Sequence, residues 1–204
     1  MPHYWEEAKK CLAERDAVLA RVMSHYHGEI LKPKGDAFYT LARSIVGQQI
    51  SVKAADSVWR KFENLLEDIS PHSLQKQSDE KLRACGLSAS KVRYLQDLSR
   101  YFLENPNVEA ELKSLPDAEV EKSLISIKGI GKWSAEMFLI FYLARPDIFP
   151  IADIGLQKAI FRHYNNSEKM LLENLTKISE NWKPYRTVAT WYLWRSLDPV
   201  PVEY

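Results

Sequence analysis

The sequence has few cysteines, little excess charge and no long apolar run. Its 204 residues include only Cys11 and Cys85, which cannot form a disulfide framework or supply the four thiolates of an iron–sulfur cluster. The net charge is +1, so any surface that attracts nucleic acid has to be local. The longest apolar run, residues 137–144, is far too short to cross a bilayer. These absences argue against a disulfide-bonded secreted domain, a cluster enzyme and a membrane protein.

Targeting and metal signals are also missing. The charged opening MPHYWEEAKK does not resemble a secretory signal. His25 and His27 are two residues apart and so point to different sides of a helix, and the other histidines have no partner at ligand spacing. We therefore expect no metal site built from side chains. We expect a soluble, intracellular protein.

Most of the chain is expected to be helical. Apolar residues recur at helical spacing over residues 2–23 and 88–104, and Ser70 and Ser78 stand where helix N-caps are found. The sequence shows neither convincing alternating strands nor internal repeats. The predicted fold is all-α, with about ten helices joined by short connections.

Two glycines interrupt the most apolar part of the chain, in the segment SLISIKGIGKWSAEMFLIF. Helices avoid glycine, so one helix is expected to end near Ile127 and the next to begin near Lys132. Glycine on both sides of the KGIG turn permits positive φ and close approach by another molecule. The first amides of the new helix would suit a DNA phosphate. A C-cap glycine followed by a turn glycine would explain the same pattern without a ligand.

This turn resembles the helix-hairpin-helix of the HhH/GPD DNA glycosylase superfamily, in which a Gly/Pro-rich loop and an aspartate follow. Here the loop and aspartate are present as RPDIFPIADIGLQKAI. The similarity extends in the same order to ARSIVGQQISVKAA, GLSASKVRYLQDLS and WKPYRTVATWYLWR, over nearly the whole chain. Together these segments resemble the 3-methyladenine DNA glycosylase II group, which acts on alkylated purines such as 3-methyladenine and 7-methylguanine. One departure is Lys128, where many relatives have proline.

The resemblance implies a two-lobed helical enzyme with DNA in a cleft between the lobes. One lobe would comprise about residues 1–35 and 135–204, and the other about residues 36–134, with the helix-hairpin-helix at residues 117–143 beside the cleft. The expected partner is double-stranded DNA containing alkylated bases, and the expected state is a monomer. A monovalent cation could bind the hairpin carbonyls, and no other cofactor is expected. The residues expected to hold the DNA backbone are Lys128, Gly129, Ile130, Gly131, Lys132 and Ser134.

Asp153 is the expected catalytic residue. The segment from Ala144 to Ala152 contains two prolines that favour extension, and it can span about 30 Å. It could therefore run back along the preceding helix, which is about 18 Å long, and bring Asp153 near the hairpin. A carboxylate there would stabilise the oxocarbenium-like sugar as the N-glycosidic bond breaks, or orient or deprotonate the attacking water. Taken alone, Asp153 could equally be the N-cap of the helix IGLQKAIFRHY.

Trp133 stands at the hairpin position where bifunctional members of the superfamily carry a lysine that forms a Schiff base with the sugar. The lysine of this chain is one residue earlier, at Lys132. A shift of one residue turns a helical side chain by about 100°, so Lys132 should face phosphate instead of the sugar carbon. The resemblance therefore implies a monofunctional enzyme that leaves abasic sites.

An enzyme that flips a base out of the duplex needs a pocket for that base. Trp194 matches a pocket aromatic of the family, and Trp133 and Tyr39 are further candidates because electron-poor purines stack on aromatic rings. Met137 is included as well, although a relative has tyrosine at that place. Packing in the core would explain any one of these side chains without a ligand.

The gap left by a flipped base has to be filled. The segment GQQIS resembles the wedge loop of the family, with Gln49 at the plug position and Ile50 or Ser51 beside it. A glutamine can fill the gap and form a hydrogen bond with the orphaned base. A helix junction marked by glycine, with solvated polar residues, would explain the same segment.

Two other functions remain open. A related glycosylase for mismatched, deaminated or oxidised bases would use the same motifs, and only a panel of lesions would separate it. A non-enzymatic module that binds only the DNA backbone would need neither Asp153 nor an aromatic pocket. Loss of the Asp153 carboxylate would leave such a module unaffected.

Overall fold

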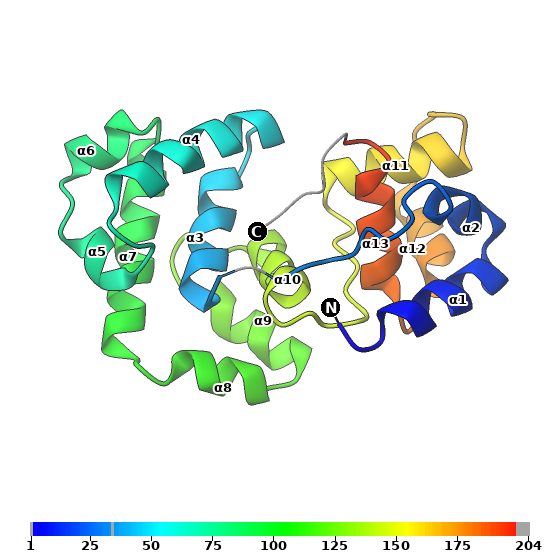
Figure 1. Ribbon diagram of the computed structural model, residues 1–204, viewed down its shortest axis with the longest axis horizontal. Helices are drawn as coiled ribbons and strands as arrows, with labels where there is room; N and C mark the ends of the chain where they lie inside the picture. Colours follow the sequence, from blue (N-terminus) through cyan, green and yellow to red (C-terminus); the bar gives the residue numbers. More distant parts are fainter. Residues whose placement is uncertain (1, 34, 199–204) are drawn as a thin grey trace. The chain divides into compact units, whose positions relative to one another are not determined.

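The computed structural model describes residues 2–33 and 35–198, and these residues form thirteen α-helices and no strand (Figure 1). This confirms the all-α class. Within the described residues, no helix is both long and apolar enough to span a membrane. The chain divides into two compact units, one made of residues 2–33 and 144–198 and the other of residues 35–143.

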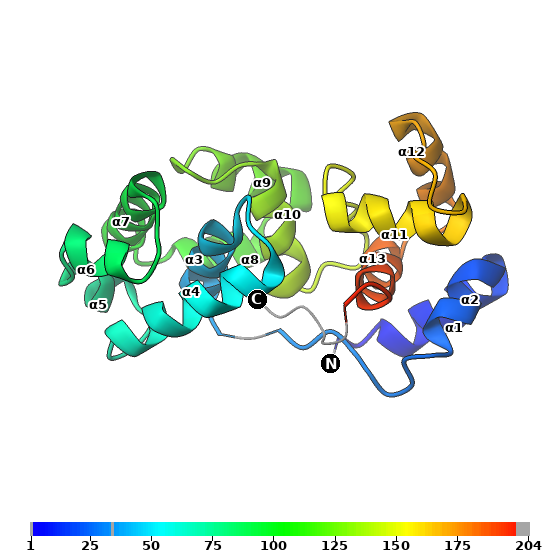
Figure 2. The same ribbon diagram turned by 90° about the horizontal axis from the view of Figure 1, so that it is seen from above.

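The first unit contains α1 (Trp5–Arg15), α2 (Ala17–Met23), α11 (Ile154–Tyr164), α12 (Leu172–Glu180) and α13 (Arg186–Arg195). Its centre is α13, which packs against α1, α2 and α11 (Figure 2). Every residue of α13 from Thr187 to Trp194 is buried. A helix buried on all sides lies in the core of its unit, so groups on α13 are fixed more firmly than groups on the surface.

The single helix expected over residues 2–23 is in fact two helices. Asp16 ends α1 in an extended conformation (φ −139°, ψ 102°) and caps α2 through the amides of Val18 and Leu19. Its other oxygen accepts hydrogen bonds from the Tyr164 hydroxyl (2.8 Å) and the Trp182 indole (2.9 Å). The break therefore depends on two partners that are distant in the sequence, which helical spacing alone does not reveal.

The second unit contains eight helices in the described part of the chain. They are α3 (Ala37–Gly47), α4 (Val52–Leu65), α5 (Pro71–Gln75), α6 (Asp79–Ala84), α7 (Ala89–Glu104), α8 (Val108–Ser114), α9 (Asp117–Ile125) and α10 (Lys132–Phe141). Its core is α3, which packs against α4, α7 and α10. The sequence patterns did not indicate α8, which is short and has an exposed face, and this helix and the break at Asp16 raise the number above the expected ten.

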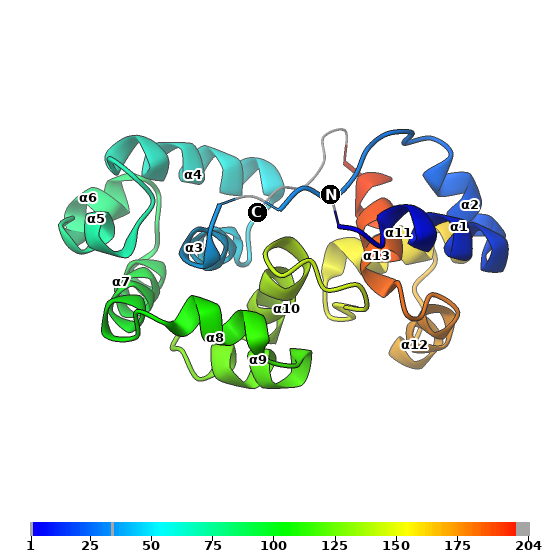
Figure 3. The same ribbon diagram turned by 60° about the horizontal axis from the view of Figure 1, so that its bottom comes forward.

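The boundary between the units also differs from the expected one. α10 packs against α3 and α9, so it belongs whole to the second unit, and the division falls after Leu143 (Figure 3). The expected boundary near residue 135 is therefore too early, because it would separate α10 from the helices that cover its apolar side chains. The expected DNA cleft between the lobes stays a prediction.

Candidate functional site

The glycine-containing turn lies between two helices, as the sequence predicted. α9 ends at Ile125, and α10 begins at Lys132 with Gly131 as its N-cap. Ile130 is buried, and its amide donates to the carbonyl of Ile127 (3.0 Å), which closes the turn. The first amides of α10 have no acceptor within the helix and carry the positive end of its dipole. This end of the turn is therefore suited to an anion.

The two hairpin glycines have different roles. Gly129 has φ +91°, and a Cβ at this position would lie 2.3 Å from the Tyr94 ring, so only glycine fits. Gly131 has φ −102°, and a Cβ there would meet no heavy atom within 4 Å. The expectation that both glycines permit positive φ is therefore wrong for Gly131, whose backbone is the ordinary extended one of an N-cap.

The side chains expected to hold DNA differ in exposure. Lys128 and Lys132 are exposed, and the Lys132 ammonium lies 3.8 Å from a Glu121 oxygen, which is a weak surface pair. Ser134 is buried on α10. The contact of the two exposed lysines with a phosphate stays a prediction, whereas the Ser134 hydroxyl is already bonded to Gln48 inside the unit.

The loop expected to act as the wedge joins α3 to α4. Gln49, Ile50 and Ser51 are all exposed, and Ser51 caps α4 by accepting a hydrogen bond from the Ala54 amide (3.3 Å). Gln49 has φ +59°, a left-handed conformation that is unfavourable for a residue with a side chain. The tip of this loop is therefore an exposed and strained glutamine followed by an apolar side chain.

Two residues that the sequence motifs did not single out fix this loop. Gln48 Nε2 donates to the Gly129 carbonyl (2.9 Å) and to Ser134 Oγ (3.0 Å). Lys91 Nζ donates to the carbonyls of Val46 and Gln48, each at 2.8 Å. Burial lowers the pKa of the Lys91 ammonium. The sequence did contain a signal for Gln48: only one of two adjacent glutamines can be at the plug position, so the other needs a different role.

In the first unit, Asp153 is the N-cap of α11. Its Oδ1 atom accepts hydrogen bonds from the Leu156 amide (2.6 Å) and from the Trp194 indole nitrogen (2.8 Å). A Cβ on Gly155 would lie 3.1 Å from the same oxygen and 3.6 Å from the Trp194 ring, so glycine leaves room for this bond. Asp153 does cap its helix, and the cap and the indole together orient the carboxylate.

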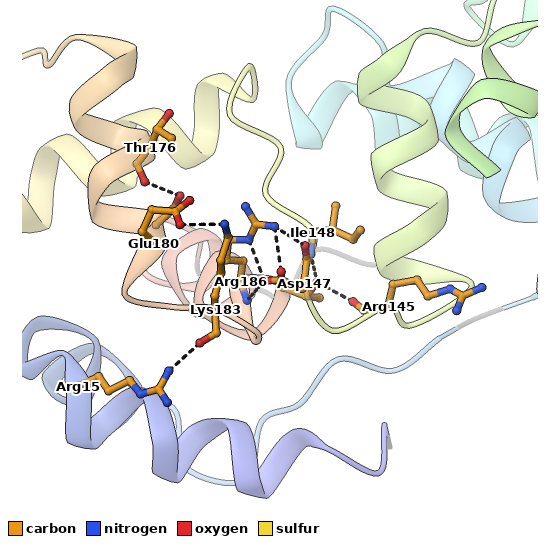
Figure 4. Close-up of polar contacts among 10 residues, drawn as sticks. Arg15, Arg145, Asp147, Ile148, Thr176, Glu180, Lys183 and Arg186 are labelled. Carbon is orange, nitrogen blue, oxygen red and sulfur yellow. Dashed lines mark hydrogen bonds and ion pairs between the residues drawn. The ribbon is translucent and has the colours of Figure 1, made fainter. Parts of the chain in front are cut away.

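The segment that leads to Asp153 is attached to the start of α13 by an ion pair (Figure 4). Arg186 Nε and Nη2 donate to the two carboxylate oxygens of Asp147, at 2.7 and 2.9 Å. Arg186 Nη2 also donates to the Asp147 carbonyl (3.1 Å). This bidentate geometry holds the segment more firmly than a single surface ion pair would.

Thr187 makes a second attachment beside the first. Its hydroxyl donates to the Arg145 carbonyl (2.6 Å) and accepts from the Ile148 amide (3.0 Å), and its own amide donates to the Pro146 carbonyl (3.0 Å). Thr187 and Trp194 are seven residues apart on α13, about 10 Å along its axis. The buried helix α13 thus holds the segment through Thr187 near its N-terminus and the Asp153 carboxylate through Trp194 near its C-terminus.

A family model for HhH-GPD superfamily base excision DNA repair proteins matches residues 42–184. The chain belongs to this superfamily. This confirms the resemblance seen in the hairpin and in the loop with its aspartate. The family and the relatives named below show that this chain is a DNA glycosylase, an enzyme of base excision repair. Its partner is DNA.

The relatives of this HhH-GPD protein include DNA-3-methyladenine glycosylase 1 of Schizosaccharomyces pombe. It is 30% identical over 184 residues, which cover 87% of this chain and 80% of the relative. The DNA-3-methyladenine glycosylase of Saccharomyces cerevisiae is 32% identical over 196 residues, which cover 78% of this chain and 66% of the relative. The chain therefore spans about two thirds or more of each of these proteins.

Solved structures show the same fold. The S. pombe 3-methyladenine DNA glycosylase Mag1 in complex with abasic DNA superposes with a TM-score of 0.83 at 28% identity, covering 93% of this chain and 96% of that one. The DNA-3-methyladenine glycosidase of Bacillus halodurans gives a TM-score of 0.76 at 34% identity, covering 95% and 89%. The HhH-GPD fold is thus shown by sequence and by structure.

The candidate site residues of the glycosylase fall into two groups. Asp153 and Trp194 belong to the first unit and are in direct contact, whereas the hairpin, the wedge loop and the other pocket candidates belong to the second. Of those candidates, Met137 is buried, Trp133 is half-buried, and Tyr39 is half-buried with its ring edge-on to Trp59. Their roles as pocket residues stay predictions.

Among the described residues, no three His, Cys, Asp or Glu side chains gather as they would around a metal ion. Two hairpin carbonyls are engaged: that of Gly129 accepts from Gln48, and that of Ile127 accepts from Ile130. The expected monovalent cation at the hairpin carbonyls stays a prediction.

Proposed function

We propose that this glycosylase removes alkylated purines of the 3-methyladenine and 7-methylguanine type from double-stranded DNA and leaves an abasic site. The observation that carries the proposal is the fixed carboxylate of Asp153. Two N–H groups, from Leu156 and Trp194, hold one of its oxygens, and the segment before it is attached to α13. Such a carboxylate needs little rearrangement as charge develops on the sugar.

The chemistry follows from the charge of the substrate. As the bond between sugar and base breaks, the sugar gains oxocarbenium character, which the Asp153 carboxylate stabilises while it orients or deprotonates the attacking water. Enzymes that cleave bonds between sugars also use an acid to protonate the leaving group. An alkylated purine already carries positive charge and leaves readily, so one carboxylate is sufficient.

The second unit supplies most of the DNA-binding residues in this proposal. Amides of the hairpin and the start of α10 bind a phosphate, with Lys128 and Lys132 adding charge. Gln49 and Ile50 fill the gap left by the flipped base. Trp194, Trp133, Tyr39 and Met137 are the proposed lining of the base pocket. We expect the protein to act as a monomer on the genome, in the cytoplasm of a bacterium or the nucleus of a eukaryote.

Strand cleavage is not part of the proposed activity. Trp133 stands where the bifunctional enzymes carry their lysine, and Lys132 is the exposed first residue of α10. We expect strand breaks in treated DNA to appear only after heat or alkali. A covalent adduct between Lys132 and DNA, trapped with borohydride, would contradict this expectation.

The test compares base release by the wild type and by Asp153→Asn on methylated duplex DNA. The asparagine side chain keeps an oxygen that can cap α11 but carries no charge, so the fold and the affinity for DNA should persist. We expect free methylpurines from the wild type and a loss of about 10²–10³-fold in rate for Asp153→Asn. The matched control is Asp36→Asn, the same change at the exposed N-cap of α3, which should release bases normally.

The possible results separate the functions considered. Near-normal base release by Asp153→Asn would refute the role of the carboxylate. If wild type and Asp153→Asn bind duplex DNA equally and neither releases a methylpurine, alkylated purines are not the substrate. A panel with mismatched, deaminated and oxidised bases would then distinguish another glycosylase specificity from a module that only binds DNA.

A further inference from the structure

The tip of the wedge loop has a backbone conformation that its own sequence does not favour. Gln49 has φ +59°, where a side chain crowds the following carbonyl oxygen. Such a conformation persists when the surrounding structure holds it in place, and it is found more often at functional sites than elsewhere. Gln49 is exposed, so this conformation has to be held by the residues next to it in the chain.

The residue before the tip is held from two directions. The Gln48 side chain reaches the hairpin, where it donates to the Gly129 carbonyl and to Ser134 Oγ. The Gln48 carbonyl, which belongs to the same peptide unit as the Gln49 amide, accepts a hydrogen bond from the Lys91 ammonium of α7. Lys91 also binds the Val46 carbonyl, so its charge lies at the C-terminal end of α3, where the helix dipole favours a cation.

Ser51, which follows the exposed Gln49 and Ile50, is fixed as well. Ser51 caps α4 through the Ala54 amide, so only Gln49 and Ile50 lie between two anchored points. With both ends set, the loop has little freedom to relax the left-handed residue into a common conformation. The strain at Gln49 is thus maintained by bonds to the hairpin, to α7 and to α4.

We propose that Gln48 and Lys91 are positioning residues that form the wedge before DNA arrives and connect it rigidly to the hairpin. We call this pair of residues, with their bonds to Gly129, Ser134 and the Val46 and Gln48 carbonyls, the wedge clamp. The inference rests on the proposed function, because it assigns the loop to the gap left by a flipped base. The clamp keeps Gln49 and Ile50 directed outward, so the loop does not have to be ordered during insertion.

A clamp of this kind predicts a defect that depends on base pairing. Removing it should slow the excision of a lesion that has to be taken out of an intact pair, because insertion of the wedge then has to order the loop. It should have little effect where the opposing nucleotide is already missing, since flipping is then less costly. A purely structural defect or a change in the chemical step would slow both substrates equally.

The experiment measures single-turnover release of 7-methylguanine placed either opposite cytosine or opposite a one-nucleotide gap. The variants are Gln48→Ala and Lys91→Met. We expect each to be about tenfold slower on the paired substrate and within about twofold of wild type on the gapped one. The matched control is Gln75→Ala, which removes a similar glutamine bond, from α5 to the Gln96 carbonyl of α7, and should leave both rates unchanged.

A second measurement addresses the strain directly. Asparagine adopts the left-handed conformation more readily than glutamine, so a Gln49→Asn background should be less dependent on the clamp. We expect Gln48→Ala to slow the paired reaction less in that background than in the wild type. An equal slowing in both backgrounds would overturn the claim that the clamp supports the strained conformation.

A third readout needs no base release. A duplex with a stable abasic analogue opposite 2-aminopurine should change fluorescence when the wedge meets the orphaned base. Wild type should give this change and Gln48→Ala a smaller one at saturating protein. Equal changes would refute the clamp, and so would equal slowing on the two excision substrates. If wild type releases no base but the fluorescence difference is present, the proposed function fails and the clamp stands.

Discussion

Thr187→Val tests whether the segment that carries Asp153 is held by the start of α13. Thr187 is fully buried, and its hydroxyl both donates to the Arg145 carbonyl and accepts from the Ile148 amide. Valine has nearly the same shape and fills the same space. The substitution therefore removes the hydrogen bonds of the hydroxyl while leaving the packing of α13 almost unchanged.

The expected magnitude follows from these two bonds. Each is worth about 1 kcal/mol, and the Ile148 amide, on a residue only 8% exposed, would lose its acceptor at a further cost of about 1–3 kcal/mol. The free energy of unfolding should fall by about 3–5 kcal/mol. With a urea dependence of about 2 kcal/mol per molar, the urea midpoint should move down by roughly 1.5–2.5 M. Base release should also slow by about tenfold or more, because Asp153 is less well positioned.

The assay is urea denaturation followed by tryptophan fluorescence, together with base release at a temperature where both proteins are folded. Thr187→Ser is the control, since it keeps the hydroxyl and loses only a methyl group, at about 1 kcal/mol. A valine variant within about 0.5 kcal/mol of wild type that releases bases at the same rate would show that the Thr187 hydroxyl does not hold the segment. A serine variant less stable than the valine variant would show the same.

Two further predictions test other parts of the site. Trp194→Phe removes the indole N–H that donates to Asp153 but keeps an aromatic ring. Base release should therefore slow by about tenfold, with unchanged affinity for DNA. Single-turnover rates equal to those of the wild type would show that this bond does not orient the carboxylate. Gly129→Ala should destabilise the protein by about 2 kcal/mol or more in urea denaturation, because φ is +91° and the new methyl group would collide with Tyr94. Gly131→Ala should behave like wild type. Similar losses of stability for both variants would contradict the different roles of the two glycines.

Local signals in the sequence predicted local structure well. Ser70 with Pro71, and Ser78, cap the helices that they were expected to cap, and the turn between α9 and α10 lies where two glycines interrupt an apolar run. These features depend on residues within a few positions of each other, so they can be read from a short segment. The cap at Asp153 is of the same kind.

Features that depend on distant partners could not be predicted in this way. The break at Asp16 depends on Tyr164 and Trp182, and the bond from Gln48 to Gly129 joins residues 81 positions apart. No periodic pattern encodes which polar side chain meets which carbonyl across such a distance. The family motifs indicated that GQQIS is a wedge, but only the folded unit shows that its first glutamine points to the hairpin.

The two groups of candidate residues are each set by bonds within one unit. Asp153 is held by α11 and α13, which carry its cap, its indole partner and the attachments of its segment. Gln49 is positioned by α4, α7 and the hairpin through Ser51, Lys91 and Gln48. Contributions from sites that share no partners usually add. Loss of the Asp153 carboxylate should therefore remove the chemical step without loosening the wedge. Loss of the wedge clamp should weaken insertion of the wedge without altering the chemical step. Base pairing opposite the lesion separates the two effects, because only insertion depends on it.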